Sequence, residues 1–83
     1  MTGKILYKAS VSHDLKRIAP KDKERILRQI AEVLGGNPMG GERLHGEFGG
    51  LFKLRVGGYR VIYAMAGEEV IVLRIRERSK AYD

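Results

Sequence analysis

Two consecutive glycines, Gly57 and Gly58, separate two stretches in which apolar and basic side chains alternate. Residues 51–56 and 59–65 are expected to be strands, because successive side chains of a strand point to opposite faces of a sheet. Glycine accepts the positive φ angles that a two-residue hairpin turn requires. The predicted antiparallel pairs are Val56 with Tyr59, Arg55 with Arg60, Leu54 with Val61 and Phe52 with Tyr63.

Residues 67–69 predict a second turn, which leads into a third strand at 70–76. A three-residue loop is expected, because a two-residue loop would turn Arg74 and Arg76 toward the apolar core, where loss of hydration is costly. The predicted pairs are Val61 with Ile75 and Tyr63 with Leu73.

One face of this meander is apolar and the other is basic. The basic face carries Lys53, Arg55, Arg60, Arg74 and Arg76, and the three predicted strands contain no acidic residue. The whole chain has a formal charge of +6, which suits nucleic acid, an acidic protein or an anionic membrane surface. Like charges opposite each other destabilise a sheet, so their clustering favours a phosphate-binding site over a merely solvated face.

The first half of the chain predicts one strand and two helices. Residues 4–8 are prone to form a strand, and a short helix follows with Ser10 or Ser12 as its N-cap. Pro20 is expected to open a second, amphipathic helix, which ends at residues 35–38. The apolar stripes of the two helices are Val11, Leu15 and Ile18, and Ile26, Leu27, Ile30, Val33 and Leu34.

These elements predict an α+β fold in one domain, residues 1–83. Its small antiparallel sheet combines the three C-terminal strands with the N-terminal strand, and the two helices pack on one face. Residues 35–50 are expected to be an irregular connection, because they lack the Gly-Lys-Ser/Thr ending of a phosphate loop. No signal peptide or membrane span is found, so a cytoplasmic location without a membrane partner is expected.

The residue types limit the chemistry that the basic face can perform. The chain has no cysteine and no carboxylate cluster, so neither a metal nor a cofactor is expected. Ser12, His13 and Asp14 are adjacent and cannot point at one another as a catalytic triad requires. Arginines can hold a scissile phosphate, and the 2′-hydroxyl of RNA can attack that phosphate without a metal. Lys53 or Tyr82 is a candidate to assist the proton transfer.

Two stretches of the sequence carry a family resemblance. Residues 51–63, with the core Gly-Tyr-Arg-Val-Ile-Tyr, resemble the RelE/ParE superfamily of toxins from toxin–antitoxin pairs. Residues 76–82, Arg-Glu-Arg-Ser-Lys-Ala-Tyr, are similar to the RelE branch, whose members cut messenger RNA in the ribosomal A site. ParE-like members poison DNA gyrase and generally lack this arginine–tyrosine ending.

The resemblance assigns roles by position. It implies that Arg60 binds the phosphate, Arg76 supports the leaving group, Tyr82 stacks on or orients the RNA, and Lys53 acts as base or stabilises charge. Further RNA contacts are expected from Arg55, Arg74, Arg78, Arg43 and His45. The sequence departs from the family pattern at two positions, since Leu51 replaces a lysine and His45 replaces a basic residue of the preceding loop.

The resulting prediction is a type II toxin that cleaves mRNA on the ribosome without metal and leaves a 2′,3′-cyclic phosphate. Its expected partners are mRNA in the ribosomal A site and a small acidic antitoxin, held in a hetero-oligomer. Two alternatives remain open: a ParE-like toxin that inhibits gyrase without nuclease activity, and a non-catalytic RNA-binding module.

Overall fold

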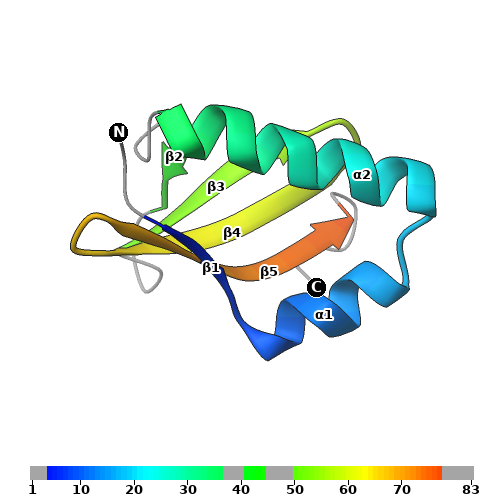
Figure 1. Ribbon diagram of the computed structural model, residues 1–83, viewed down its shortest axis with the longest axis horizontal. Helices are drawn as coiled ribbons and strands as arrows, with labels where there is room; N and C mark the ends of the chain where they lie inside the picture. Colours follow the sequence, from blue (N-terminus) through cyan, green and yellow to red (C-terminus); the bar gives the residue numbers. More distant parts are fainter. Residues whose placement is uncertain (1–3, 37–40, 45–49, 78–83) are drawn as a thin grey trace.

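The computed structural model describes residues 4–36, 41–44 and 50–77 (Figure 1). Along the chain, one short strand is followed by a helical region and then by a group of strands. The elements are β1 (Ile5–Tyr7), α1 (Ala9–Lys16), α2 (Pro20–Gln29), the π-helical turn η1 (Ile30–Leu34), β2 (Glu42–Arg43), β3 (Leu51–Val56), β4 (Tyr59–Ala66) and β5 (Glu69–Glu77). The α+β class is therefore confirmed.

The sheet is mixed, with the strand order β1-β5-β4-β3-β2. The prediction of a wholly antiparallel sheet is wrong for β1, which runs parallel to β5 and pairs Ile5 with Val70. Both helices lie between β1 and the meander in the sequence, and such a crossover is the connection that parallel strands need. Periodicity identifies a strand but does not give its direction, which is why the sequence did not settle this point.

A second correction concerns the glycine-rich connection. Glu42 and Arg43 were expected to be irregular, but they form β2 at the edge of the sheet and pair with Lys53 and Phe52. Leu44 N donates to the carbonyl oxygen of Leu51 at 2.9 Å and continues this pairing. Two residues are too few to show an alternating pattern, so only the contact with β3 defines the strand.

The β3–β4 hairpin has the predicted register at all four pairs. The second turn differs, because it closes with two residues and pairs Ala66 with Glu69, while Gly67 has a φ of 66°. Because the turn is one residue shorter than predicted, Tyr63 pairs with Val72 and not with Leu73. A β-bulge between Ile62 and Tyr63 then shifts the register by one residue. The bulge keeps Arg74 and Arg76 off the core face, which was the physical requirement behind the three-residue loop.

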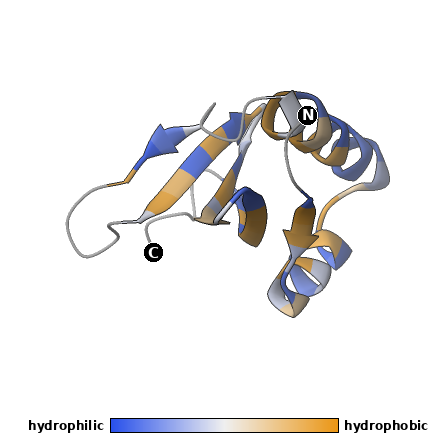
Figure 2. Cartoon of the chain, turned by 60° about the vertical axis from the view of Figure 1, so that its left-hand side comes forward, coloured by the Kyte–Doolittle hydropathy of each residue, from blue (hydrophilic) through white to orange (hydrophobic). Residues whose placement is uncertain are grey.

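The core lies between the apolar face of the sheet and the helices. Ile26, Ile30 and Leu34 of the α2–η1 segment are buried, as the amphipathic pattern predicts. The same core contains the rings of Phe52 and Tyr63, which stack with their centroids 5.3 Å apart. Figure 2 shows polar and apolar residues alternating along the strands, so each strand presents one face to this core.

The two helices begin differently from one another. Pro20 is the first residue of α2, as predicted, whereas α1 begins after Lys8 without a side-chain cap. The serine caps were therefore wrong, since the Ser10 hydroxyl donates instead to the carbonyl oxygen of Leu73 at 2.6 Å. The predicted end of the second helix falls partly on residues 37–38, outside the described residues, and Gly35 and Gly36 are still helical.

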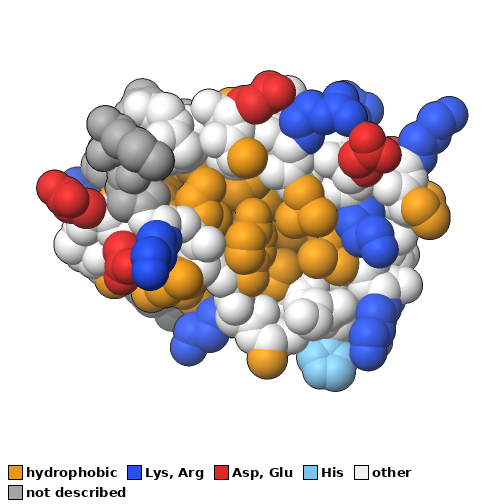
Figure 3. Space-filling view, in the orientation of Figure 1, with side chains coloured by type: hydrophobic (Ala, Val, Ile, Leu, Met, Phe, Trp, Pro, Cys, Tyr) orange, Lys and Arg blue, Asp and Glu red, His pale blue; other side chains and the backbone are white. Residues whose placement is uncertain are grey.

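The helices do not cover the sheet completely. Figure 3 shows apolar side chains gathered between α1 and α2, where part of the core face is open to view. On β1, Leu6 and Tyr7 are exposed. Within the described ranges, no helix has the length and apolar character needed to cross a membrane.

Candidate functional site

The basic face is built around Arg60 on the central strand β4. The register places Arg60 between Arg55 on β3 and Arg76 on β5, as the sequence predicts. Directly opposite side chains in a sheet lie about 5 Å apart at their Cβ atoms, so three guanidinium groups share one small area. Arg55 is exposed and Arg76 half-buried, but Arg60 is only 4% exposed. This burial was not predicted, and it makes Arg60 the most enclosed cation of the row.

Lys53 lies on the same face and has an acidic neighbour that the sequence did not reveal. Its Nζ is 3.7 Å from Oε2 of Glu42, the residue that pairs with it across β2 and β3. The Lys53 side chain is largely buried, whereas that of Glu42 is exposed. The three predicted strands contain no acidic residue, but β2 adds a carboxylate to this edge of the face.

Gly41 fixes the position of Glu42. Its backbone N donates to the hydroxyl oxygen of the buried Tyr63 at 2.9 Å. A Cβ atom at this position would lie 2.6 Å from the carbonyl oxygen of Lys53 and would also collide with the Tyr63 hydroxyl. The close approach thus requires glycine, and it holds β2 against the sheet where Glu42 can reach Lys53.

Asp14 of α1 binds the end of β5. Its two carboxylate oxygens accept hydrogen bonds from Nε and NH2 of Arg74, and Oδ2 also accepts one from the backbone N of Ile75, all at 2.9 Å. Strand β1 ends at Tyr7, opposite Val72, so it does not reach Ile75. The side chain of Asp14 therefore takes the place of a neighbouring strand at this edge.

The environment of Asp14 favours its ionised form. Burial alone would raise its pKa, but the hydrogen bonds from Arg74 and Ile75 and the charges of Arg74 and Arg76 outweigh this effect. The pKa of Asp14 is consequently lowered. Arg74, expected to contact RNA, thus has an acidic partner that no pattern in the meander could have shown.

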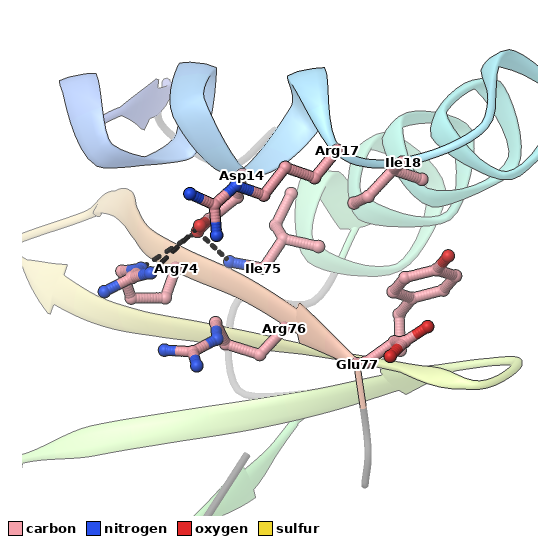
Figure 4. Close-up of a pocket in the computed structure, with 8 residues that line it drawn as sticks. Asp14, Arg17, Ile18, Arg74, Ile75, Arg76 and Glu77 are labelled. Carbon is pink, nitrogen blue, oxygen red and sulfur yellow. Dashed lines mark hydrogen bonds and ion pairs between the residues drawn. The ribbon is translucent and has the colours of Figure 1, made fainter. Parts of the chain in front are cut away.

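An open pocket of about 170 Å³ lies beside this ion pair, between α1 and the end of β5 (Figure 4). Arg17, Arg74 and Arg76 contribute its positive charges. Asp14, Glu77 and Tyr59 also line it. Arg17 was not among the predicted site residues, because α1 was interpreted only as a core helix.

The remaining predicted residues have different positions. Arg43 pairs with Phe52, so it lies on the side of the sheet opposite Lys53 and the arginine row. His45, Arg78 and Tyr82 lie outside the described residues. Leu51, one of the two departures from the family pattern, belongs to an apolar row across four strands at the far end of the basic face. This row consists of Leu6, Ile71, Ala64 and Leu51.

Among the residues that the structure describes, no three histidine, aspartate or glutamate side chains gather closely enough to hold a metal ion. The candidate site is therefore a row of cations with one carboxylate at its edge. Such a row can bind a phosphate and stabilise extra negative charge on it.

The family model for the ParE toxin of the type II toxin–antitoxin system parDE matches residues 5–82. The chain belongs to this toxin family, and the predicted RelE/ParE superfamily is confirmed. No sequence among the curated proteins matches the chain.

Solved structures from both branches of the superfamily share the fold. The toxin–antitoxin complex RelBE2 from Mycobacterium tuberculosis matches with a TM-score of 0.87 at 23% identity, covering 94% of this chain and 100% of that one. The archaeal RelE–RelB complex from Pyrococcus horikoshii matches at 0.70 and 26% identity, covering 98% and 100%. The chromosomal ParDE system from P. aeruginosa matches at 0.73 and 19% identity, covering 92% and 96%. The fold is thus common to toxins of both kinds and does not separate them.

Proposed function

We propose that this toxin is a ribosome-dependent endoribonuclease that cleaves mRNA by attack of the 2′-hydroxyl. The observation that carries the proposal is the row Arg55–Arg60–Arg76, with the almost buried Arg60 at its centre. Cross-strand repulsion costs stability, and functional sites commonly hold such arrangements. A phosphate placed on the row would relieve the repulsion.

In the proposed reaction, Arg60 binds the scissile phosphate and stabilises the charge that builds up as the 2′-oxygen attacks. A bond forms between the 2′-oxygen and phosphorus, and the bond from phosphorus to the 5′-oxygen breaks, which leaves a 2′,3′-cyclic phosphate. Arg76 stabilises the departing 5′-oxygen, which takes up a proton from water. The family resemblance suggests that Tyr82 stacks on or orients the RNA.

The proton of the 2′-hydroxyl needs an acceptor near the phosphate. Lys53 is the residue that the family resemblance suggests, but an ammonium group must first lose a proton to act as a base. The Glu42 carboxylate, 3.7 Å from Lys53 Nζ, is a second candidate that can accept a proton directly. In that arrangement Lys53 would serve mainly to stabilise the phosphate charge.

The proposed partner is an acidic antitoxin that covers the basic face in a hetero-oligomer. Three observations support it: the net charge of +6, the adjoining apolar row that ends at Leu51, and the antitoxin bound in related complexes such as the one from P. horikoshii. A cytoplasmic location, where mRNA is translated, is part of the same proposal.

Inhibition of gyrase is the second candidate function, and it is favoured by the family model that matches the chain. Primer extension on mRNA translated in the presence of the purified toxin, run beside a gyrase supercoiling assay, separates the two. We expect new cleavage ends within codons and unchanged supercoiling. Inhibited supercoiling with intact mRNA would contradict the proposal.

A further inference from the structure

The pocket between α1 and β5 has a basic half and an acidic half. Arg74 and Arg76 lie on the open face of β5, and Arg17 reaches the same pocket from the C-terminal end of α1 (Figure 4). Glu77 alternates to the other face and pairs with Tyr59. The two halves therefore offer different surroundings to a ligand.

The acidic half is unsuited to an anion. Burial raises the pKa of Tyr59, and the negative charges of Asp22 and Glu77 together with a hydrogen bond to Asp22 raise it further. A negative potential of this kind would repel a phosphate. An anionic ligand is thus confined to the basic half, beside Arg17 and Arg76.

Arg74 and Asp14 also lie in this half, and their opposite charges offset each other, so its net positive charge comes from Arg17 and Arg76. The guanidinium of Arg74 is held by both carboxylate oxygens of Asp14 at 2.9 Å, and the same carboxylate binds Ile75 N. Asp14 therefore fixes the backbone immediately before Arg76 against α1, the helix that Arg17 directly follows. The two arginines are brought to one pocket by a single side chain from α1.

We propose that Arg17 and Arg76 form a second phosphate-binding position for the RNA, with Asp14 as its positioning residue. This inference rests on the proposed function, since it assumes that RNA crosses the basic face. The cavity volume of about 170 Å³ is below the roughly 300–1,000 Å³ of small-molecule sites, so it suits a single phosphate group. The forked guanidinium group of arginine matches the oxygens of such a group.

The second phosphate is a different one from the scissile phosphate. Arg60 on β4 is directly opposite Arg76 on β5, one strand spacing of about 5 Å away, whereas Arg17 follows α1, which packs against β5. Arg76 lies between them and contributes to both. The RNA strand would thus run across the sheet from β3 toward α1, which extends the basic face by one cation that the meander does not supply.

The test uses Arg17→Gln and a matched control, Arg28→Gln. Arg28 is an exposed arginine on α2 that pairs with Glu24 at 2.8 Å and does not line the pocket. The probe is a short single-stranded RNA whose 2′-hydroxyls are all methylated, so that it binds without being cut. Fluorescence anisotropy measures its affinity for the full-length toxin over a range of salt concentrations.

We expect Arg17→Gln to weaken RNA binding several-fold at low salt and to reduce the slope of log K against log salt by about 0.7, the value for one phosphate contact on a single strand. Arg28→Gln should leave the slope unchanged. Equal effects of the two variants would overturn the second phosphate position. Binding of poly-glutamate is measured as well. If Arg17→Gln binds poly-glutamate less well but binds RNA as before, the second phosphate position is also overturned, because the pocket would then bind protein carboxylates.

Cleavage and binding measurements on the original protein distinguish an error in the second phosphate position from an error in the proposed function. If it cleaves translated mRNA while Arg17→Gln and Arg28→Gln bind the probe equally, only the second position is wrong. If it neither cleaves mRNA nor binds the probe, both the proposed function and this inference are wrong.

Discussion

Arg60 and Arg74 are the same residue type, on neighbouring strands and on the same face of one sheet, but their surroundings differ. Arg74 is half-exposed and forms two hydrogen bonds with the carboxylate of Asp14. Arg60 is almost fully buried and has an arginine opposite it on each side. Arg74 thus has a carboxylate as its partner, whereas the two cross-strand neighbours of Arg60 are cations.

Under the proposed function, the difference separates an arginine that is bound within the fold from one that binds a phosphate. A buried or half-buried charge is stabilised most readily by an opposite charge with good hydrogen-bond geometry, which is the arrangement at Arg74. Placing like charges beside a buried arginine does not help folding. An anion bound by the row would remove that disadvantage, and the predictions below test this contrast.

The largest expected effect concerns cleavage. Arg60→Gln should lower the rate of mRNA cleavage on ribosomes by about 100-fold or more, the loss typical when one group that stabilises a charged transition state is removed. Arg74→Gln, the matched change on the next strand, should lower it much less. Similar cleavage rates in the two variants would show that the arginines of this face are equivalent.

The next effect concerns the unfolding free energy. Here a change to the Asp14–Arg74 pair should have a larger effect than a change to Arg60. Asp14→Ala removes three hydrogen bonds and leaves Ile75 N without its acceptor, so we expect a loss of about 2–4 kcal/mol in unfolding free energy. Glu24→Ala, which breaks the exposed pair with Arg28, should cost less than about 0.5 kcal/mol. Arg60→Gln should change the unfolding free energy by less than about 1 kcal/mol.

Urea unfolding of the three variants beside the original protein measures these differences. A large loss in Arg60→Gln together with a small loss in Asp14→Ala would reverse the comparison. It would then be Arg60 that holds the fold together.

The smallest effect is the pH dependence of the Asp14 contribution. The pKa of Asp14 is lower in the folded protein than its ordinary value of 3.8, so its carboxylate stabilises the fold above that pH. The contribution is lost as the pH falls below 3.8 and through the folded-state pKa. Relative to Asp14→Asn, the original protein should lose its advantage in urea melts over this range. If the difference in unfolding free energy between the two proteins stays constant as the pH falls below 3.8, the ionised carboxylate is not its cause.

The sequence predicted much of the meander because the signals there are local. Gly57 and Gly58 fix the hairpin turn, and from the turn the register of β3 against β4 follows by counting residues. Alternation then assigns each side chain to a face. At the second turn the predicted loop length was wrong, but Arg74 and Arg76 were still correctly assigned to the basic face. Loss of hydration penalises any register that buries these two side chains.

The candidate site was predicted in part, for the same reason. The row Arg55–Arg60–Arg76 follows from strand register, and the structure has it. Glu42 was missed because its strand has only two residues, and Arg17 was missed because it is the C-cap of α1 and lies outside the predicted basic face. Neither position carries a pattern that a sequence window can detect.

The sequence by itself thus determined the amphipathic helix after Pro20, the hairpin and the two chemically different faces of the sheet. Tertiary structure alone decided the parallel direction of β1, the carboxylate beside Lys53 and the Asp14–Arg74 pair, whose members are 60 residues apart. Turns and periodicity depend on neighbours within a few residues, and those neighbours are written in the sequence. Contacts between distant segments depend on how the helices pack against the sheet edge, which no local pattern specifies.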